Sequence, residues 1–299
     1  MSQIDLNLIR VFVAIYETQS ATAAAEQPNI TQPTVSYGLG KLREALSDHL
    51  FVRDRRSLKP TPRANMLYPR FRDALNSIGN AIEETQSFDP RTDSRVFSIA
   101  MTDIGSLYFL PSLEADFQEK APSIGVEIRQ VQVDEIVDQL SSGRLDAAVG
   151  NLPSLRGQTR SAVIFREHYV CLVGKKQALA MGEMTMDTFL ASRHVAVSST
   201  YSGHRLAEDA LQDLGISRRI VVRTPYYTAL PLLISNSDLI VLLPSRIARI
   251  FASQTDVVAM PAPMDLPEFD VRMHWHRRHE TSPALLWLLE RIESVSRSL

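Results

Sequence analysis

The chain has 299 residues, of which 44% are hydrophobic and 22% charged, and its formal net charge is −2. This length favours two or three domains, and the composition excludes a disordered or fibrous protein. The single cysteine, Cys171, excludes an intrachain disulfide and leaves too few thiolates for a structural zinc site or an iron–sulfur cluster. The first residues do not resemble a secretory signal, and no window approaches roughly eighteen apolar residues in a row, so we expect a cytoplasmic protein.

Residues 1–60 predict three helices in succession. Apolar residues at helical spacing place the first helix at about 5–20. The second is a short alanine-rich helix at about 20–27, with Ser20 as its N-cap and Pro28 at its end. Thr31 can cap a third helix, along one face of which apolar side chains repeat. These are Val35, Leu39, Leu42 and Leu46.

The opposite face of the third helix carries side chains that suit base edges and phosphates. Short hydrogen-bonding residues at a helix start are unusual for a merely solvated face, which would favour Glu and Lys. A three-helix bundle with no DNA role is the alternative, and it does not explain this composition. Residues 41–63 also carry seven basic against three acidic residues. The predicted DNA contacts on this helix are Thr31, Gln32, Pro33, Thr34, Ser36, Tyr37 and Lys41.

The same residues resemble the helix-turn-helix of the LysR-type transcription regulators. The likeness rests on the segments 20–25 and 30–36, on Leu39 and Leu42, and on the segments 50–53 and 59–63. In that family these segments form the scaffold helix, the recognition helix and the wing of a winged helix-turn-helix. The resemblance therefore implies that Arg53 and Arg55 lie on the wing and reach the DNA backbone or the minor groove.

Four residues depart from the usual pattern of this family. Pro28 stands where most relatives have leucine. Gly38 and Gly40 are each expected to cost the recognition helix about 1 kcal/mol relative to alanine, so we expect DNA contact to complete its ordering. Tyr37 stands where many relatives have arginine, and a phenol cannot bind guanine through two hydrogen bonds. The base preference at that step stays open.

A longer helix is predicted to follow, starting with Thr61 as N-cap and Pro62 in its first turn. Apolar residues recur along it at coiled-coil spacing, namely Leu67, Phe71, Leu75, Ile78 and Ile82. Pro69 is expected to kink it, and the turn-forming segment 87–90 ends it. A helix packed on its own domain is the alternative to a seam between subunits. The LysR resemblance implies the seam, and so a homo-oligomer, dimer or tetramer, that reads two half-sites.

From residue 95 onward strand and helix patterns alternate, which predicts a parallel sheet with crossover helices. We expect strands at 96–101, 126–133 and 145–149, and helices at 107–120 and 134–142. The segment 142–150 resembles the strand entry of type 2 periplasmic-binding-protein-like sensor domains. This resemblance implies an α/β domain with two lobes, lobe I at 95–165 and 266–299 and lobe II at 166–265. The chain then divides into 1–60 (winged helix-turn-helix), 61–88 (linker helix) and 89–299 (effector-binding domain).

A small effector is expected between the two lobes, because ligands of open α/β folds bind beyond the carboxyl ends of strands. Residues 101–105, 169–171, 203–204 and 244–246 resemble most the regulators of aromatic-compound degradation that answer to salicylate-like or nitroaromatic acids. In those regulators the histidine and arginine that match His204 and Arg246 line the inducer pocket. The predicted effector contacts are Thr102, Asp103, Ser106, Phe165, Glu167, Ser202, His204, Thr228 and Arg246.

Chemistry suggests a role for several of these residues. Arg246 can pair with a carboxylate, His204 can hydrogen-bond a phenol or carboxylate, and Phe165 can flank a ring. The alternatives are a surface ion pair for Arg246 and a solvated or capping role for His204. Relatives carry a pocket histidine where this chain has Glu167, with His168 displaced by one place. An acid there disfavours an anionic inducer unless Arg246 compensates.

Other classes of function are less well supported by the sequence. His274, His276 and His279 are spaced like metal ligands, but no acid or cysteine completes a clear set. There is no Gly-x-Ser-x-Gly elbow or P-loop, and Cys171 lies in an apolar strand, as a core residue does. We therefore expect no enzyme and no cofactor, but a DNA-binding regulator controlled by a small effector, an aromatic carboxylate. A ligand-independent regulator and a cytoplasmic solute-binding protein remain as alternatives. The expected partners are promoter DNA, the effector and further copies of the chain, with RNA polymerase as a further candidate and no membrane.

Overall fold

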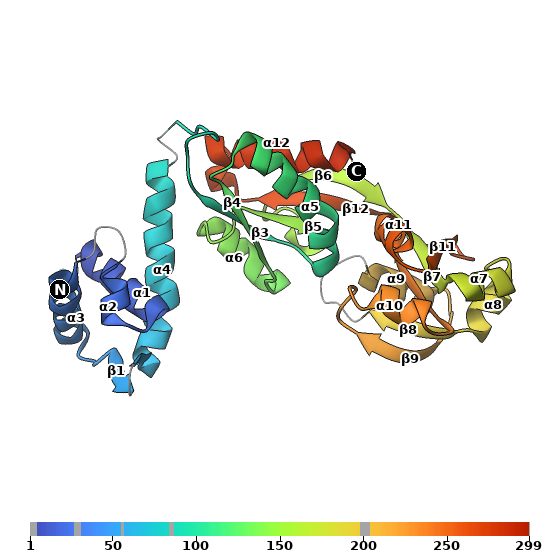
Figure 1. Cartoon of the computed structure of the whole chain (residues 1–299), viewed down its shortest axis with the longest axis horizontal. Coiled ribbons are helices and arrows are strands. Elements are labelled where there is room, and N and C mark those ends of the chain that lie inside the picture. The colour runs from blue at the N-terminus through green and yellow to red at the C-terminus, as the bar shows by residue number, and fades with distance from the viewer. Residues whose placement is uncertain (1–4, 27–30, 55–56, 84–86, 198–203, 299) are drawn as a thin grey trace. The chain divides into compact units, whose positions relative to one another are not determined.

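The computed structural model describes residues 5–26, 31–54, 57–83, 87–197 and 204–298 (Figure 1). The chain forms two compact units. One comprises Met1–Gln86 with Ser142–Arg144, and the other, here named the sensor unit, comprises Ser87–Ser141 with Leu145–Leu299. Within the described ranges, every helix is too short or too polar to cross a membrane.

The N-terminal unit begins with three helices, α1 (Leu6–Thr18), α2 (Ala21–Ala24) and α3 (Gln32–Leu46). Asp5 and Ser20 cap the first two, and each side chain accepts a hydrogen bond from a backbone amide of its helix. The short helix α2 ends at Ala24, before the expected end at residue 27, because Ala25 and Glu26 continue as a turn. A hairpin of β1 (Phe51–Asp54) and β2 (Ser57–Pro60) follows, and then α4 (Pro62–Glu83).

Helix α3 is continuous through both of its glycines. Gly38 is buried against α1, and a Cβ there would lie 3.3 Å from Val11 Cγ1. Glycine therefore lets α1 and α3 approach closely, which offsets its low helix propensity. Around Gly40, by contrast, no described atom lies within 4 Å of the place of a Cβ.

The first half of α4 packs on α1. The rings of Tyr16 and Tyr68 stack with centroids 3.8 Å apart, and the Tyr68 hydroxyl donates to Glu17 at 2.8 Å and accepts from Arg72 at 2.9 Å. Leu67 and Phe71, two residues of the predicted seam, pack against the core of the N-terminal unit. For this half of the helix the alternative of packing on its own domain is therefore confirmed. Ile78, farther along, is exposed.

The first sheet of the sensor unit has the strand order β4-β3-β5-β12-β6. Its strands are β3 (Val96–Ala100), β4 (Gly125–Arg129), β5 (Ala147–Gly150), β6 (Arg160–Glu167) and β12 (Phe269–Trp275). Strand β3 is parallel to β4 and β5, as expected, whereas β12 is antiparallel to β5 and β6. The sheet is therefore mixed, because the chain returns to it from the second lobe.

Helices cover both faces of this first sheet. Phe97 and Ile99 of β3 share a core with α5 (Asp103–Lys120) and α12 (Pro283–Ser298), while the alternate residue Ala100 faces α6 (Ile136–Ser141). This alternation is the period of two that places successive strand residues on opposite faces. Helix α5 begins at Asp103, earlier than expected, because the Thr102 hydroxyl caps it by accepting from the Gly105 amide at 3.1 Å.

The second sheet has the order β11-β7-β10-β8-β9 and forms the second lobe (Figure 1). Its strands are β7 (Tyr169–Gly174), β8 (Arg193–Val197), β9 (Arg219–Thr224), β10 (Leu239–Pro244) and β11 (Val257–Pro261). Its helices are α7 (Lys175–Met181), α8 (Met186–Ala191), α9 (His204–Asp213), α10 (Leu230–Ser235) and α11 (Ser245–Gln254). Three short 3-10 helices complete the sensor unit, η1 (Val133–Glu135), η2 (Pro153–Leu155) and η3 (Arg277–His279).

The chain crosses between the two sheets twice. Strand β6 stays in the first sheet until Glu167, which pairs with Phe269, and β7 begins at Tyr169 in the second sheet. The first crossover therefore lies at His168 rather than at Phe165, because the pairing with β12 extends β6. The return segment between Pro261 and Phe269 contains Leu266, the residue at which we expected it.

Candidate functional site

The predicted DNA contacts of α3 lie on its solvent-exposed side. Thr31 caps the helix, and its hydroxyl lies 2.7 Å from that of Thr34. Tyr37 is 67% exposed, the highest fraction among the large apolar and aromatic residues of this helix. The other exposed residues of the set are Gln32, Pro33, Ser36 and Lys41. Lys41 donates to Glu44 at 3.0 Å, and this hydrogen bond raises the pKa of the lysine.

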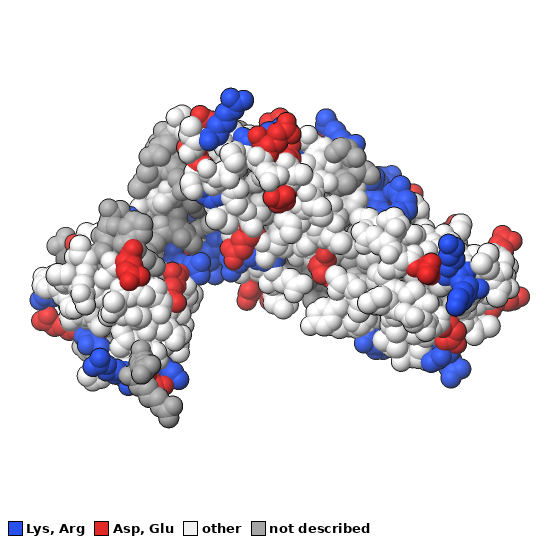
Figure 2. Space-filling view, in the orientation of Figure 1, with Lys and Arg blue, Asp and Glu red and all other residues white. Residues whose placement is uncertain are grey.

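The hairpin β1–β2 presents the second predicted group of DNA contacts. Arg53 is exposed on β1, and Lys59 on β2 forms an ion pair with Asp54 at 2.9 Å. Figure 2 shows basic side chains where Figure 1 labels β1. Arg55, the other predicted wing residue, lies outside the described residues.

The loop that joins α3 to the hairpin is held by two charged side chains. Arg43 donates to the carbonyls of His49 and Phe51, at 2.7 and 2.9 Å. The Asp48 carboxylate accepts from the Leu50 amide and the Thr61 hydroxyl, and these bonds lower its pKa. Arg43 therefore holds the loop that leads from α3 into the hairpin.

A cavity lies between the two lobes of the sensor unit. Four of the predicted effector contacts line it, namely Thr102, Phe165, Glu167 and Arg246. Most of its wall is apolar or aromatic, and part of it comes from residues that the sequence analysis did not single out. These added lining residues include Tyr108, Phe109, Asn151, Tyr227, Phe269 and Val271.

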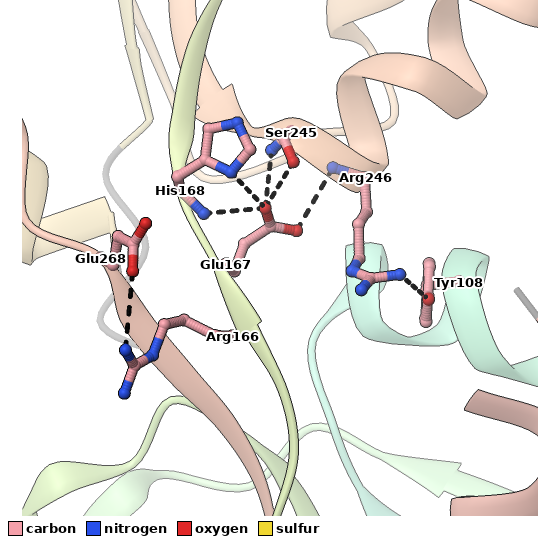
Figure 3. A network of polar contacts seen from close by, with 7 residues as sticks. All are labelled: Tyr108, Arg166, Glu167, His168, Ser245, Arg246 and Glu268. Carbon is pink, nitrogen blue, oxygen red and sulfur yellow. Dashed lines mark hydrogen bonds and ion pairs between the residues drawn. The ribbon is translucent and has the colours of Figure 1, made fainter. Parts of the chain in front are cut away.

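Arg246 is the cation of this cavity (Figure 3). Its guanidinium carbon lies 4.3 Å from the centroid of the Phe165 ring, and Nη1 donates to the Tyr108 hydroxyl at 2.9 Å. Among the described residues, no carboxylate lies within 4.0 Å of this guanidinium. The surface ion pair considered as its alternative role is therefore absent from the described part of the chain.

Glu167 is the anion of the cavity and is only 3% exposed. Its carboxylate accepts four hydrogen bonds at the first turn of α11 and at the crossover (Figure 3). His168, the histidine displaced by one place, donates its backbone amide to Glu167, while its side chain is 59% exposed. His168 is not among the described lining residues of the cavity.

Three other predicted effector contacts, Asp103, Ser106 and Thr228, are not among the described lining residues of the cavity. Asp103 accepts hydrogen bonds from the backbone amides of Tyr227 and Thr228, at 2.9 and 3.4 Å, and so ties α5 to the segment before α10. Ser106 donates to the Thr102 carbonyl at 3.0 Å, and Thr228 is exposed. Ser202 lies outside the described residues, as does the side chain of His204, whose backbone begins α9.

Comparisons with known proteins agree with this arrangement. Residues 6–65 match the bacterial regulatory helix-turn-helix protein, lysR family, and residues 90–297 match the LysR substrate binding domain. The HTH-type transcriptional activators NagR of Ralstonia sp and NahR of Pseudomonas putida are each 33% identical over 288 residues, which is 96% of this chain and 96% of each of theirs. The HTH-type transcriptional regulator LinR of Sphingobium indicum is 32% identical over 99% of this chain and 98% of its own.

The chain belongs to the LysR family. It is a DNA-binding transcription regulator with an effector-binding domain, and not an enzyme. The resemblance inferred from the residues is confirmed over the whole length of the chain.

Solved structures of LysR-family regulators share the fold. The probable transcriptional regulator PA0477 from Pseudomonas aeruginosa has a TM-score of 0.80 and 29% identity, covering 97% of this chain and 96% of its own. Full-length CbnR complexed with its target DNA has a TM-score of 0.66 over 98% of this chain and 99% of its own. At 19% identity, the similarity to CbnR shows a shared fold and nothing further.

In this LysR-family chain Cys171 and the C-terminal histidines lie apart from the cavity lining. Cys171 is fully buried in β7, and burial raises the pKa of its thiol to about 12, which confirms it as a core residue. His274 is also fully buried and lies 3.0 Å from the Thr159 hydroxyl, while His276 caps η3.

Proposed function

We propose that this LysR-family regulator binds a small aromatic acid in the sensor cavity and that binding alters how its N-terminal unit engages promoter DNA. The observation that carries the proposal is Arg246, a guanidinium in an apolar cavity with no carboxylate partner among the described residues. A charge in such surroundings is costly unless it is paired, and a ligand carboxylate is the partner that suits a guanidinium.

The aromatic character of the effector follows from the rest of the wall. Tyr108, Phe109 and Phe165 form one group of rings, with centroids between 4.9 and 6.1 Å apart. A flat ring can pack against such faces while its carboxylate reaches Arg246. The residues at 101–105 and 244–246 that resemble regulators of aromatic-compound degradation flank the same cavity, which supports the proposal.

The DNA-binding side of the proposal rests on exposure and charge. The exposed residues of α3 supply groups for base edges, and Arg53 supplies a cation for the phosphates or the minor groove.

We divide the chain into residues 1–60 for DNA binding, 61–88 as linker helix and 89–299 for effector binding. We also propose that two or four copies act together, since one short recognition helix reads too few base pairs alone. Because the target is promoter DNA, we assign the protein to the cytoplasm.

Calorimetric titration of the full chain with benzoate and salicylate tests the effector proposal. Hydrogen bonds to a charged group contribute about 1.5–3 kcal/mol, so Arg246→Met should weaken binding of both acids by at least about tenfold. The matched control is Arg249→Met, which removes an exposed arginine of the same helix and should leave binding unchanged. Equal binding by wild type and Arg246→Met would contradict the role of Arg246. If wild type binds neither acid, a ligand-independent regulator becomes the better description.

A further inference from the structure

The cavity contains an anion of its own, and we propose that this anion selects effectors by charge. The Glu167 carboxylate takes the place at the N-terminus of α11 where a ligand anion would otherwise bind. The cavity therefore accepts acids with one carboxylate and rejects acids with two. This inference rests on the proposed function, since it specifies which acids the sensor cavity takes.

The first step of the argument is the set of contacts around Glu167. Oε1 accepts from the Ser245 hydroxyl at 2.6 Å, from the His168 amide at 2.9 Å and from the Ser245 amide at 3.2 Å. Oε2 accepts from the Arg246 amide at 3.2 Å. All four partners are donors, so both oxygens of this carboxylate, which is only 3% exposed, have hydrogen-bond partners within the protein.

The second step is what these donors do in other proteins. The amides of the first helical turn have no partner within the helix, and the helix dipole adds partial positive charge there, so a helix N-terminus commonly binds a ligand anion. Helix α11 has ten residues and begins at the cavity wall. In this chain its first two amides already bind Glu167, so a ligand carboxylate would have to compete with Glu167 for them and would meet its negative charge.

The third step is the separation of the two charges in the cavity. The Arg246 backbone amide binds Glu167, but the Arg246 side chain extends away to Tyr108 (Figure 3). Its guanidinium carbon lies 4.3 Å from the centroid of the Phe165 ring. The cavity therefore has a cationic end at the guanidinium and an anionic end at Glu167. One carboxylate is accommodated at the cationic end, and a second one on the same small ring is brought towards the anionic end, where it is repelled.

The test compares benzoate with its three dicarboxylate analogues, phthalate, isophthalate and terephthalate, by calorimetry on the full chain at constant ionic strength. Wild type should bind every dicarboxylate at least about tenfold more weakly than benzoate. Glu167→Ala, which frees the Ser245 hydroxyl and the Arg246 amide, should reduce this preference by about tenfold for at least one isomer. Glu167→Gln keeps the size of the side chain and an acceptor oxygen, and it should shift the preference in the same direction. The matched control, Glu268→Ala, removes a carboxylate that is 58% exposed and should keep the wild-type preference.

Two results would overturn the inference while leaving the proposed function intact. One is wild-type binding of a dicarboxylate as tight as that of benzoate. The other is an unchanged preference in both Glu167 variants, with circular dichroism showing that they are folded. If Glu167→Ala fails to fold, Glu167→Gln decides alone.

Failure of the proposed function gives a different result, namely no binding of benzoate by wild type. In that event sulfate, which needs no aromatic pocket, tests the α11 site by itself. Sulfate should raise the melting temperature of the folded Glu167 variant by more than it raises those of wild type and Glu268→Ala. An equal rise in all three proteins would overturn the inference.

Discussion

At the scale of single residues, His274 shows how burial fixes a protonation state. Its side chain is fully buried in β12, and burial, with smaller effects of Arg272 and Arg156, lowers its pKa to about 4. The neutral ring is therefore the form that the folded sensor unit holds. His194 is also buried, and its Nε2 donates to the Phe189 carbonyl at 2.7 Å; burial lowers its pKa in the same way.

A pH dependence of stability follows from His274. Between pH 6.5 and about 4 the unfolded chain holds a proton on this residue that the folded chain does not. The contribution of His274 to the free energy of unfolding is therefore fully present above pH 6.5. This free energy falls by up to about 3 kcal/mol as the pH drops to 4. His274→Phe should reduce the slope of the unfolding free energy against pH. His168→Phe, which replaces an exposed histidine, should leave that slope unchanged. The fluorescence of Trp275 and Trp287 during urea unfolding reports on the sensor unit, and equal slopes in His274→Phe and wild type would refute the assignment.

At the scale of elements, the two glycines of α3 make a matched pair. Gly40→Ala meets no described atom within 4 Å, so it should stabilise the helix by about 0.5–1 kcal/mol. Hydrogen exchange of the α3 amides, followed by mass spectrometry, should slow by about two- to fivefold. Gly38→Ala places a methyl group 3.3 Å from Val11 and should give no such gain. Faster exchange in Gly40→Ala than in wild type would show that this glycine has a packing role.

Most elements of this fold were predictable from local patterns, because caps and apolar periodicity depend on neighbours in the sequence. Thr31, Thr61 and the alternation in β3 are examples. The antiparallel pairing of β12 in the first sheet was not predictable. It arises because the chain leaves this sheet at Glu167 and returns to it at Phe269, far along the sequence. The apolar spacing along α4 was also ambiguous. Residues at this spacing can pack against α1 of the same chain or against a second subunit.

The candidate site was predictable only in part. The rule that ligands bind beyond strand ends found Thr102 and Arg246, which come two residues after the ends of β3 and β10. The same rule did not find Tyr108 or Phe269, since an aromatic residue inside a helix or strand has the pattern of a core residue. Their role at the cavity depends on packing between lobes, for which the sequence carries no local signal.

At the scale of the whole molecule, the number of subunits on DNA should be visible in the salt dependence. Removing one phosphate contact lowers the slope of log K against log salt by about 1. A dimer has two copies of Arg53, so Arg53→Ala should lower this slope by about 2. Fluorescence anisotropy on a promoter fragment measures the slope. Lys59→Ala should lower it less, because Asp54 already offsets this charge at 2.9 Å. A slope that is flat in wild type, or the same change in both variants, would count against the wing as a phosphate contact.

The contacts between α1 and α4 determine how much of the chain can fold on its own. A fragment that ends at residue 60 would lack Phe71, whose ring packs edge-on against Phe12 at 5.2 Å, and Tyr68, whose ring covers Tyr16. It would also lose the hydroxyl that joins Glu17 to Arg72. We therefore expect the smallest autonomous DNA-binding module to extend beyond the wing and through Arg72. An exchange of sensor domains between relatives would have to join the two chains after that residue.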